Sequence, residues 1–302
     1  MNILITGATG FIGRHLVQRL KQDHHTIKVL SRNAVQASQK LGVSAYDWNY
    51  AYEEVPAEAL KNIQIIIHLM GENLGNGRWT VQRKHEIYDS RIVSTRKLVA
   101  AAPSSLKCFI CASAIGIYPG HGDETYDESY AVPEQGNFMQ TICRDWEKEA
   151  AAIESKGIRR VSIRTGIVLG DGGMLAKLLP IFKLGLGGPV GDGCQWLPWI
   201  HIDDLVSAYV AAAVDTRYHG AVNVVSPNPV RFNDFATALG KALHRPAFFP
   251  TPAFVLKLAL GEAAALALNS YRIVPTQLLQ TCGFEFKFTQ LSATLDDLFG
   301  KS

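Results

Sequence analysis

Short apolar runs alternate with helical patterns along the first half of the chain. The apolar runs, which predict strands, are residues 2–6, 26–31, 63–71, 106–113 and 159–165. Between them, residues 11–23, 80–102 and 136–156 repeat apolar positions at the spacing of one helix face. Strands that alternate with helices predict a parallel sheet with helices on both faces.

The pattern changes after residue 170, where glycine and proline become frequent. Residues 171–200 contain GDGG and LGLGGPVGDG, which are typical of loops, and the chain is mostly helical from residue 230 onward. We predict an α/β Rossmann-type doubly wound sheet in 1–170, with 201–229 returning to it. A smaller, mostly helical lobe is predicted from 171–200 and 230–302, with the substrate cleft between the two parts.

Charge and hydropathy exclude two classes of partner. The formal net charge is +3, from 30 basic and 27 acidic residues, which is too small to indicate binding to nucleic acid or to an acidic membrane surface. The longest apolar stretch, residues 252–269, is interrupted by Lys257, Gly261 and Glu262. A membrane span needs about 20 mostly apolar residues, so we expect a buried or interfacial helix here.

The cysteines indicate a reducing compartment and no metal. Five are scattered through a chain that is long enough to form a large core, which favours free thiols. Cys108 and Cys111 have CxxC spacing, but they fall in a predicted strand and would point to opposite faces. The sequence begins directly on a predicted strand, without a visible signal peptide. We therefore expect a cytoplasmic protein without a metal site.

A glycine pattern joins the first predicted strand to the first helix. Gly7, Gly10 and Gly13 have the spacing GxxGxxG within ITGATGFIG. The first glycine permits a tight turn, the second lets the backbone approach a pyrophosphate, and the third lets the helix pack on the strand. The strand–turn–helix context makes this pattern a prediction of dinucleotide binding.

The end of the second predicted strand points to NADP. An acidic residue near this point binds the ribose 2′-hydroxyl in NAD-preferring sites, whereas an arginine favours the 2′-phosphate. This chain has Ser31 and Arg32 there. Arg32 can also stack on the adenine. The alternative is a solvated surface arginine.

Several motifs together resemble a known superfamily. TGATGFIG, HLMGENL, SAIGIY, RTGIVLG and WIHIDD occur in the order seen in the extended short-chain dehydrogenase/reductase fold of nucleotide-sugar epimerases. GEN, RWT, DSR, CRDWE and LGLGGPVGDG resemble an atypical, epimerase-like branch that has a small C-terminal domain of unknown function. The resemblance covers essentially the whole chain. It implies NADP as cofactor and a nucleotide-binding oxidoreductase or epimerase fold, without a known substrate.

The resemblance also assigns residues to the cofactor. The turn would line the pyrophosphate, the second strand would face the 2′-phosphate, and later positions would lie near the nicotinamide. The assigned residues are Gly7, Thr9, Gly10, Phe11, Ile12, Gly13, Ser31, Arg32, Leu69, Met70, Gly71, Glu86, Arg91 and Val168. Glu86 and Arg91 share a predicted helix, and their alternative is a solvated face or a surface ion pair.

The helix over 136–156 lacks the usual catalytic pair. Working enzymes of this superfamily carry YxxxK there, in which the Tyr is the acid/base and the Lys lowers its pKa. Alignment on Glu147 puts Met139 at the Tyr position and Cys143 at the Lys position. Neither side chain is suited to that proton transfer, and a shift of register brings in no tyrosine.

Three residues are candidates to replace the pair. Ser113 is the nearest hydroxyl of the Ser/Thr type, although it lies five residues before Tyr118 where a spacing of four is usual. Tyr118 is either a substrate contact or replacement acid, or a packed loop aromatic. His201 has an ordinary pKa suited to acid/base work, and its alternative is a structural role under the site.

Two functions therefore remain open from the sequence. The first is an NADP-dependent oxidoreductase or epimerase of unknown substrate with a reorganised acid/base set. The second is a non-enzymatic NADP(H)-binding regulator or interaction protein. By analogy with the fold, a homodimer through residues 80–102 and 136–156 is expected.

Overall fold

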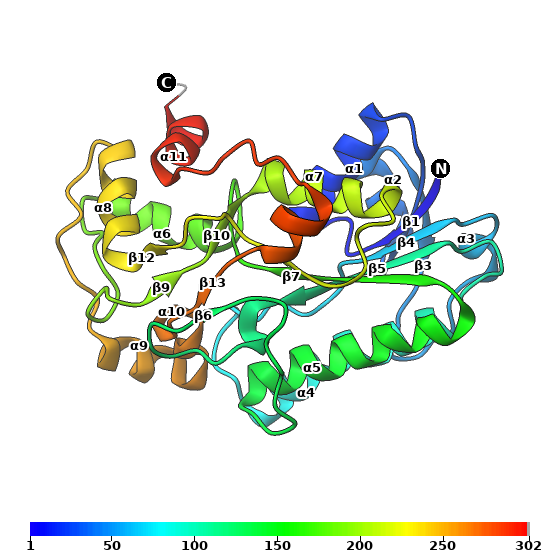
Figure 1. Ribbon diagram of the computed structural model, residues 1–302, viewed down its shortest axis with the longest axis horizontal. Helices are drawn as coiled ribbons and strands as arrows, with labels where there is room; N and C mark the ends of the chain where they lie inside the picture. The colour runs from blue at the N-terminus through cyan, green and yellow to red at the C-terminus, as the bar shows by residue number, and fades with distance from the viewer. Residues whose placement is uncertain (301–302) are drawn as a thin grey trace.

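A seven-stranded parallel sheet forms the centre of the molecule (Figure 1). The computed structural model describes residues 1–300. The strand order is β11-β7-β5-β4-β1-β2-β3, and every neighbouring pair is parallel. The strands are β1 (Asn2–Thr6), β2 (Thr26–Ser31), β3 (Ser44–Asp47), β4 (Ile65–His68), β5 (Cys108–Ala114), β7 (Arg159–Thr165) and β11 (Gly220–Val224). The predicted doubly wound α/β fold is confirmed.

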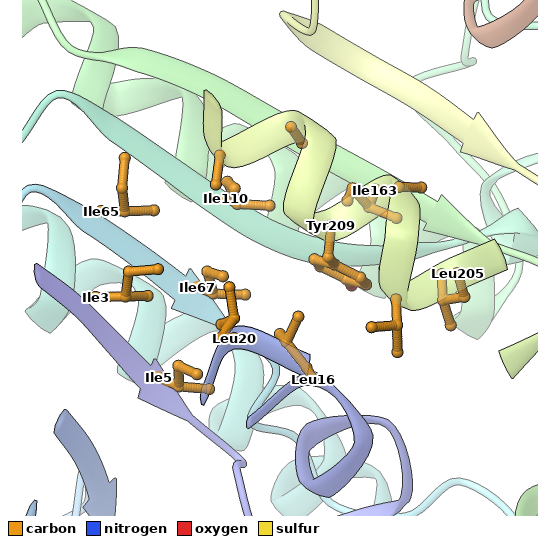
Figure 2. Close-up of a cluster of buried hydrophobic side chains, with 14 of the residues drawn as sticks. Ile3, Ile5, Leu16, Leu20, Ile65, Ile67, Ile110, Ile163, Leu205 and Tyr209 are labelled. Carbon is orange, nitrogen blue, oxygen red and sulfur yellow. The ribbon is translucent and has the colours of Figure 1, made fainter. Parts of the chain in front are cut away.

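Helices cover both faces of this sheet because its strands are apolar on both sides. One face packs on α1 (Phe11–Gln22), α2 (Ala34–Leu41) and α7 (Ile202–Val214), and the other on α3 (Ala57–Leu60), α4 (Val81–Ala100) and α5 (Phe138–Ala151). Figure 2 shows Ile3, Ile5 and Ile67 facing Leu16 of α1 and Tyr209 of α7. Alternate residues such as Leu4 and Ile66 pack against the opposite layer.

Polar side chains determine where the two long helices begin. The Thr80 side chain accepts the N–H of Arg83 and caps α4. Asn137 and Gln140 form a reciprocal capping box at the start of α5. After Ala151 the chain continues as a 3₁₀ turn, η2 (Ala152–Lys156), and ends at Gly157, which has a φ of +71°. The helix predicted over 136–156 is therefore α5 followed by η2.

The remaining residues form a smaller lobe beside the carboxyl ends of the strands (Figure 1). Its helices are α6 (Gly173–Lys183), α8 (Phe232–Ala242), α9 (Ala253–Leu260), η3 (Gly261–Ala264), α10 (Ala265–Leu268) and α11 (Leu291–Phe299). The π-helical turn η4 (Leu278–Cys282) packs instead on the core that the sheet forms with α1 and α7. Short strand pairs link it to the sheet: β8 (Ile167–Leu169) with β10 (Trp199–His201), β9 (Trp196–Leu197) with β12 (Val230–Arg231), and β6 (Thr125–Tyr126) with β13 (Arg272–Ile273). The 3₁₀ turn η1 (Ile115–Ile117) follows β5.

The apolar stretch at 252–269, expected to be a buried or interfacial helix, is neither one continuous helix nor buried along its first part. It breaks into α9, η3 and α10, and α9 has no buried residue. Phe254 and Leu258 are 71% and 73% exposed, because α9 lies at the outer edge of the lobe. Among the described residues, no helix is long and apolar enough to cross a membrane.

Candidate functional site

The turn between β1 and α1 is packed too tightly for side chains. Gly7 has a φ of +69°, and an added Cβ would lie 2.8 Å from the carbonyl carbon of Leu69. A Cβ on Gly13 would lie 2.4 Å from the carbonyl oxygen of Gly7. No side chain caps α1 at Gly10, so the N–H groups of its first turn remain available to an anionic group. The turn has the geometry that a pyrophosphate cradle requires.

The neighbouring side chains are directed away from this turn. Phe11 packs on the loop after β8, where an added Cβ at Gly172 would lie 2.6 Å from its ring. Ile12 and Val168 are half-buried against the same core as Phe11, and Thr9 is exposed. Phe11 and Ile12 would therefore offer a pyrophosphate their backbone rather than their side chains. Their assignment to the cofactor remains a prediction.

The side chain of Arg32 places a positive charge at the end of β2. The Arg32 side chain is 74% exposed, and its guanidinium lies 3.7 Å from the Glu72 carboxylate. Glu72 also pairs with Arg83 at 3.1 Å. Ser31 ends β2, and its hydroxyl accepts the N–H of Asn33. Arg32 is thus free to turn toward a ligand, at the cost of a long, solvent-exposed ion pair.

A second cation is buried directly beneath the chain that follows β4. An added Cβ on Gly71 would lie 2.8 Å from the guanidinium carbon of Arg91. Arg91 donates to the carbonyl oxygens of Ile87 and Glu72, and it lies over the Trp146 ring at 5.2 Å. Burial lowers the pKa of Arg91 to about 10, so it remains charged at neutral pH. Gly71 is required where this cation approaches the backbone.

The other residues predicted along this edge have different surroundings. Glu86 is partly exposed and binds Arg83 at 2.9 Å, which matches the surface ion pair left open as its alternative. The Leu69 amide donates to the Thr6 carbonyl and continues the sheet, while Met70 packs on the opposite core. Arg91 is therefore both buried and charged, unlike Glu86, Leu69 and Met70, which were also predicted to contact the cofactor.

Two side chains of α5 that face the centre of the molecule cannot act as an acid or a base near neutral pH. Met139 and Cys143 are both buried and both contact Gly116, where an added Cβ would lie 2.8 Å from Met139 Cε and 3.7 Å from Cys143 Sγ. Burial raises the pKa of the Cys143 thiol to about 12. Neither residue can exchange a proton near neutral pH.

Ser113 and Tyr118 belong to a buried polar network rather than to an open site. Arg164 forms a bidentate ion pair with Glu147 at 2.8 and 2.9 Å, and Ser113 donates to the same carboxylate at 2.6 Å. The Tyr118 hydroxyl accepts from Arg164 and donates to Asn223, both at 2.8 Å. Tyr118 is fully buried, and burial raises its pKa to about 12. Tyr118 therefore has the surroundings of the packed aromatic that was its alternative, and the catalytic roles of Tyr118 and Ser113 stay predictions.

His201 is also a structural residue. Its Nδ1 accepts the N–H of Asp203 and so caps α7, while its ring packs on Phe288 with centroids 3.9 Å apart. The Nε2 atom lies 3.6 Å from the Asp297 carboxylate. Burial lowers the pKa of His201, which keeps it neutral at pH 7. The residue is 1% exposed, which fits the structural role left open as its alternative, and its catalytic role stays a prediction.

A small pocket lies where the strand ends meet the second lobe. Its volume is about 140 Å³, and it is lined from the sheet side by Ala114, Gly116, Met139 and Gly166. The second lobe contributes Gln195, Trp196, Leu266, Asn269 and Tyr271. Sequence reasoning missed the residues of the second lobe, because no spacing or motif connects them with the glycine turn.

The indole of Trp196 is fixed at the edge of this pocket. Arg231 and Arg272 lie over its ring at 4.0 and 4.7 Å, and its Nε1 donates to Asp123 at 2.9 Å. Arg231 also pairs with Asp123 at 2.9 Å. These contacts hold one wall of the pocket in place.

Comparison with known proteins assigns the chain to a family. The model described as NAD dependent epimerase/dehydratase family matches residues 3–224, and one described as Domain of unknown function (DUF1731) matches residues 251–298. The chain belongs to the NAD dependent epimerase/dehydratase family.

Individual members of this epimerase family match over almost their whole length. The Epimerase family protein YfhF of Bacillus subtilis is 36% identical, covering 99% of this chain and 98% of the relative. The chloroplastic Epimerase family protein SDR39U1 homolog of Arabidopsis thaliana is 37% identical, covering 98% and 86%. The crystal structure of human epimerase family protein SDR39U1 (isoform 2) with NADPH has a TM-score of 0.88 at 31% identity and covers both chains completely.

The glycine turn of this family member fits a dinucleotide. Side chains are excluded at Gly7 and Gly13, the first turn of α1 is uncapped, and Arg32 stands exposed at the end of the next strand. A bound nicotinamide dinucleotide would supply hydride chemistry. The pocket that combines Met139 with residues of the second lobe lies outside the carboxyl ends of the strands, where ligands of doubly wound sheets bind.

Proposed function

We propose that this chain binds NADPH and acts as an oxidoreductase or epimerase-like enzyme whose substrate is not yet identified. The observation that carries the proposal is the exposed Arg32 at the end of β2, beside a glycine turn that excludes side chains. An arginine at this point suits the 2′-phosphate of NADP and offers no acceptor to the 2′-hydroxyl of NAD. The NADPH of the human relative supports the choice.

Different residues of this chain would then bind different parts of the cofactor. The backbone of the turn from Gly7 to Gly13 would hold the pyrophosphate, and Ser31 with Arg32 would hold the 2′-phosphate. Arg91 would add positive charge beneath the chain at Gly71. In this proposal α5 has no Tyr–Lys pair, because Met139 and Cys143 occupy the two positions that align with it.

A calorimetric titration tests this proposal. Protein stripped of nucleotide is titrated separately with NADP⁺, NADPH and NADH. We expect NADPH to bind much more tightly than NADH. Equal affinity for NADPH and NADH would contradict the role of Arg32, and no binding to any nucleotide would contradict the proposal as a whole.

A second function is favoured by one observation. The titratable residues first considered as acid or base, Tyr118 and His201, are both buried in structural contacts. A protein that binds NADP(H) without turnover, as a regulator or interaction protein, needs no such group. Different affinities for NADPH and NADP⁺, together with no NADPH oxidation by any carbonyl or sugar compound, would favour this alternative.

We further propose a cytoplasmic homodimer that pairs through α4 and α5. The location is supported by the five cysteines, all of which are free thiols. The dimer rests on the usual assembly of this fold. Cell fractionation and measurement of the solution mass test the two statements separately.

A further inference from the structure

The pocket beneath Met139 has a composition that limits what it can bind. No acidic or basic side chain is among its lining residues, which are mostly Ala, Gly, Leu, Pro and aromatic residues. Gln195 contributes an amide, but its Nε2 already donates to the carbonyl oxygens of Val190 and Ala267, each at 3.0 Å. The volume of about 140 Å³ is close to that of an engineered apolar cavity of about 150 Å³ that holds benzene. A single compact, mostly apolar group fits this space.

Tyr271, from the second lobe, is the residue with a hydroxyl group among those that line the pocket. Tyr271 directly precedes β13, and its backbone N–H donates to the carbonyl oxygen of Trp196 at 3.1 Å. β13 pairs in turn with β6, so Tyr271 is fixed from both sides. Its ring packs against the cluster that contains Cys143. A tyrosine hydroxyl therefore lies near the face of α5 that carries no tyrosine of its own.

The hydroxyl of Tyr271 is oriented by an amide. Asn269 Nδ2 donates to it at 3.1 Å, and within residues 1–300 the structure gives the Tyr271 proton no acceptor. Asn269 is itself packed against Gly120, where an added Cβ would lie 2.5 Å from Nδ2. Burial raises the pKa of Tyr271, so the hydroxyl keeps its proton at neutral pH. The pocket thus holds one oriented hydroxyl beside two amides, Gln195 and Asn269, in a lining that is otherwise mostly apolar.

We propose that this pocket binds a compact aldehyde or ketone with an apolar skeleton, and that Tyr271 donates a hydrogen bond, and then its proton, to the carbonyl oxygen. The proposal rests on the proposed NADPH-dependent function. A sugar fits the pocket poorly, because most of its hydroxyls would leave water without finding a partner.

The chemical step balances with the reduced nicotinamide dinucleotide as reductant. The carbonyl carbon would gain a hydride, and the π electron pair of the C=O bond would move to the oxygen. The oxygen would take the proton from Tyr271, giving an alcohol, and water would restore the proton to the tyrosinate. The dinucleotide would leave oxidised by two electrons.

Binding of two matched probes tests the site without requiring turnover. Cyclohexanone and methylenecyclohexane have similar shapes, but cyclohexanone alone has an oxygen acceptor. Affinities are measured by ligand-observed NMR titration, with and without saturating NADPH. The proteins are the wild type, Tyr271→Phe, the exposed-site control Tyr52→Phe and the pocket-filling variant Ala265→Phe.

We expect the wild type to bind cyclohexanone roughly threefold to tenfold more tightly than methylenecyclohexane, as one net hydrogen bond allows. Tyr271→Phe should remove this preference and leave the affinity for the hydrocarbon unchanged. Tyr52→Phe should change neither affinity, and Ala265→Phe should weaken binding of both probes. A preference for the ketone that survives in Tyr271→Phe, or no binding of either probe to the wild type, would overturn the proposal.

The arms with NADPH separate this inference from the proposed function. If saturating NADPH expels both probes, the pocket belongs to the cofactor, and the substrate site is overturned while cofactor binding stands. If the probes bind as expected but NADPH does not bind, the proposed function fails and the pocket remains. Both probes binding beside NADPH supports both.

Turnover tests the proton transfer. Oxidation of NADPH is followed by absorbance with cyclohexanone, 2-cyclohexenone and benzaldehyde. Tyr271→Phe should lower kcat by roughly 10²–10⁴-fold, the usual contribution of a positioned acid, with an unchanged Kd for NADPH. An unchanged kcat, or no turnover of any of these compounds by the wild type, would overturn the role of Tyr271 as acid.

Discussion

At the residue scale, the charged side chains of this protein divide into exposed and buried groups that act differently. Arg32 is exposed, and its long contact with Glu72 contributes little stability. Arg164 and Glu147 are almost completely buried and bind each other with two hydrogen bonds. An exposed arginine can turn to a ligand, whereas removal of one partner of a buried ion pair leaves the other charge buried without compensation.

Arg32→Asp should weaken NADPH binding roughly 10- to 100-fold while changing NADH binding much less. Its guanidinium is expected to donate charge-assisted hydrogen bonds to the 2′-phosphate, which NADH lacks. Isothermal titration of both nucleotides measures the difference. Lys40→Asp on exposed α2 makes the same change in charge and should leave the ratio unaltered. An equal loss for both nucleotides would remove Arg32 from this role.

Glu147→Ala should reduce the free energy of unfolding by about 3–5 kcal/mol, because it leaves Arg164 buried without its carboxylate. Glu149→Ala, on the same helix, breaks an ion pair with the exposed Arg96 and should cost about 1 kcal/mol or less. Urea denaturation of both variants makes the comparison. Similar losses would mean that the buried network does not stabilise the sheet edge.

At the element scale, the sheet and its helices are connected by a few buried polar contacts. His68 at the end of β4 binds Thr6 of β1 at 2.6 Å and Ser94 of α4 at 3.1 Å. Helix α5 faces the centre with Met139 and Cys143 instead of a polar pair. The face of α5 that carries these two side chains is therefore packed as core.

Stability should fall as the pH drops below about 6.5. Burial lowers the pKa of His68 to about 3, so the folded protein keeps it neutral while the unfolded chain takes up a proton. Stability is therefore complete above the unfolded pKa and is lost toward the folded one, by about 2 kcal/mol between pH 6 and 4.5. The buried His201 acts in the same direction. Urea midpoints across this range check the slope, which should be shallower in His68→Gln.

Cys143→Lys should destabilise the protein by roughly 3–5 kcal/mol, because it buries a cation whose nearby carboxylate, Glu147, is already paired with Arg164. The neighbouring guanidinium of Arg91, which lowers the pKa of the Cys143 thiol against the effect of burial, would repel it. Cys143→Ala removes the same sulfur without adding charge and serves as the control. If Cys143→Lys is as stable as Cys143→Ala, the new ammonium group must share the Glu147 carboxylate or reach an open space, and the prediction fails.

At the scale of the whole molecule, the two parts of the chain meet at the carboxyl ends of the parallel strands. The sheet contributes the glycine turn and the floor of the small pocket, and the second lobe contributes Trp196, Asn269 and Tyr271. The second lobe also exposes the apolar helix α9, whereas the outer face of α4 is polar. The surface of α9 therefore suits an apolar contact, and the surface of α4 suits a polar one.

The proposed homodimer predicts a solution mass of twice 33.1 kDa by light scattering. If α4 and α5 form the interface, Asp89→Lys on the exposed face of α4 should shift the mass toward one chain at low protein concentration. Leu258→Lys on α9 should leave the dimer intact. A wild-type monomer, or a dimer that is lost with Leu258→Lys alone, would contradict pairing through α4 and α5.

The sequence by itself determined the features that depend on neighbours along the chain. Residues 2–6, 26–31 and 159–165 were predicted as strands with the bounds that the structure has, because their periodicity and flanking turns are local. The fold class followed from that alternation, and the glycine spacing indicated the tight turn at Gly7. The missing tyrosine on α5 was also visible directly.

Only the tertiary structure decided which side chains are accessible and which meet across the fold. Tyr118 and His201 have suitable chemistry, but packing from distant segments buries them. Tyr271 enters the pocket because β13 pairs with β6, which lies far from it in the sequence. Burial and long-range pairing depend on the whole arrangement of elements, so they cannot be predicted from a local sequence pattern.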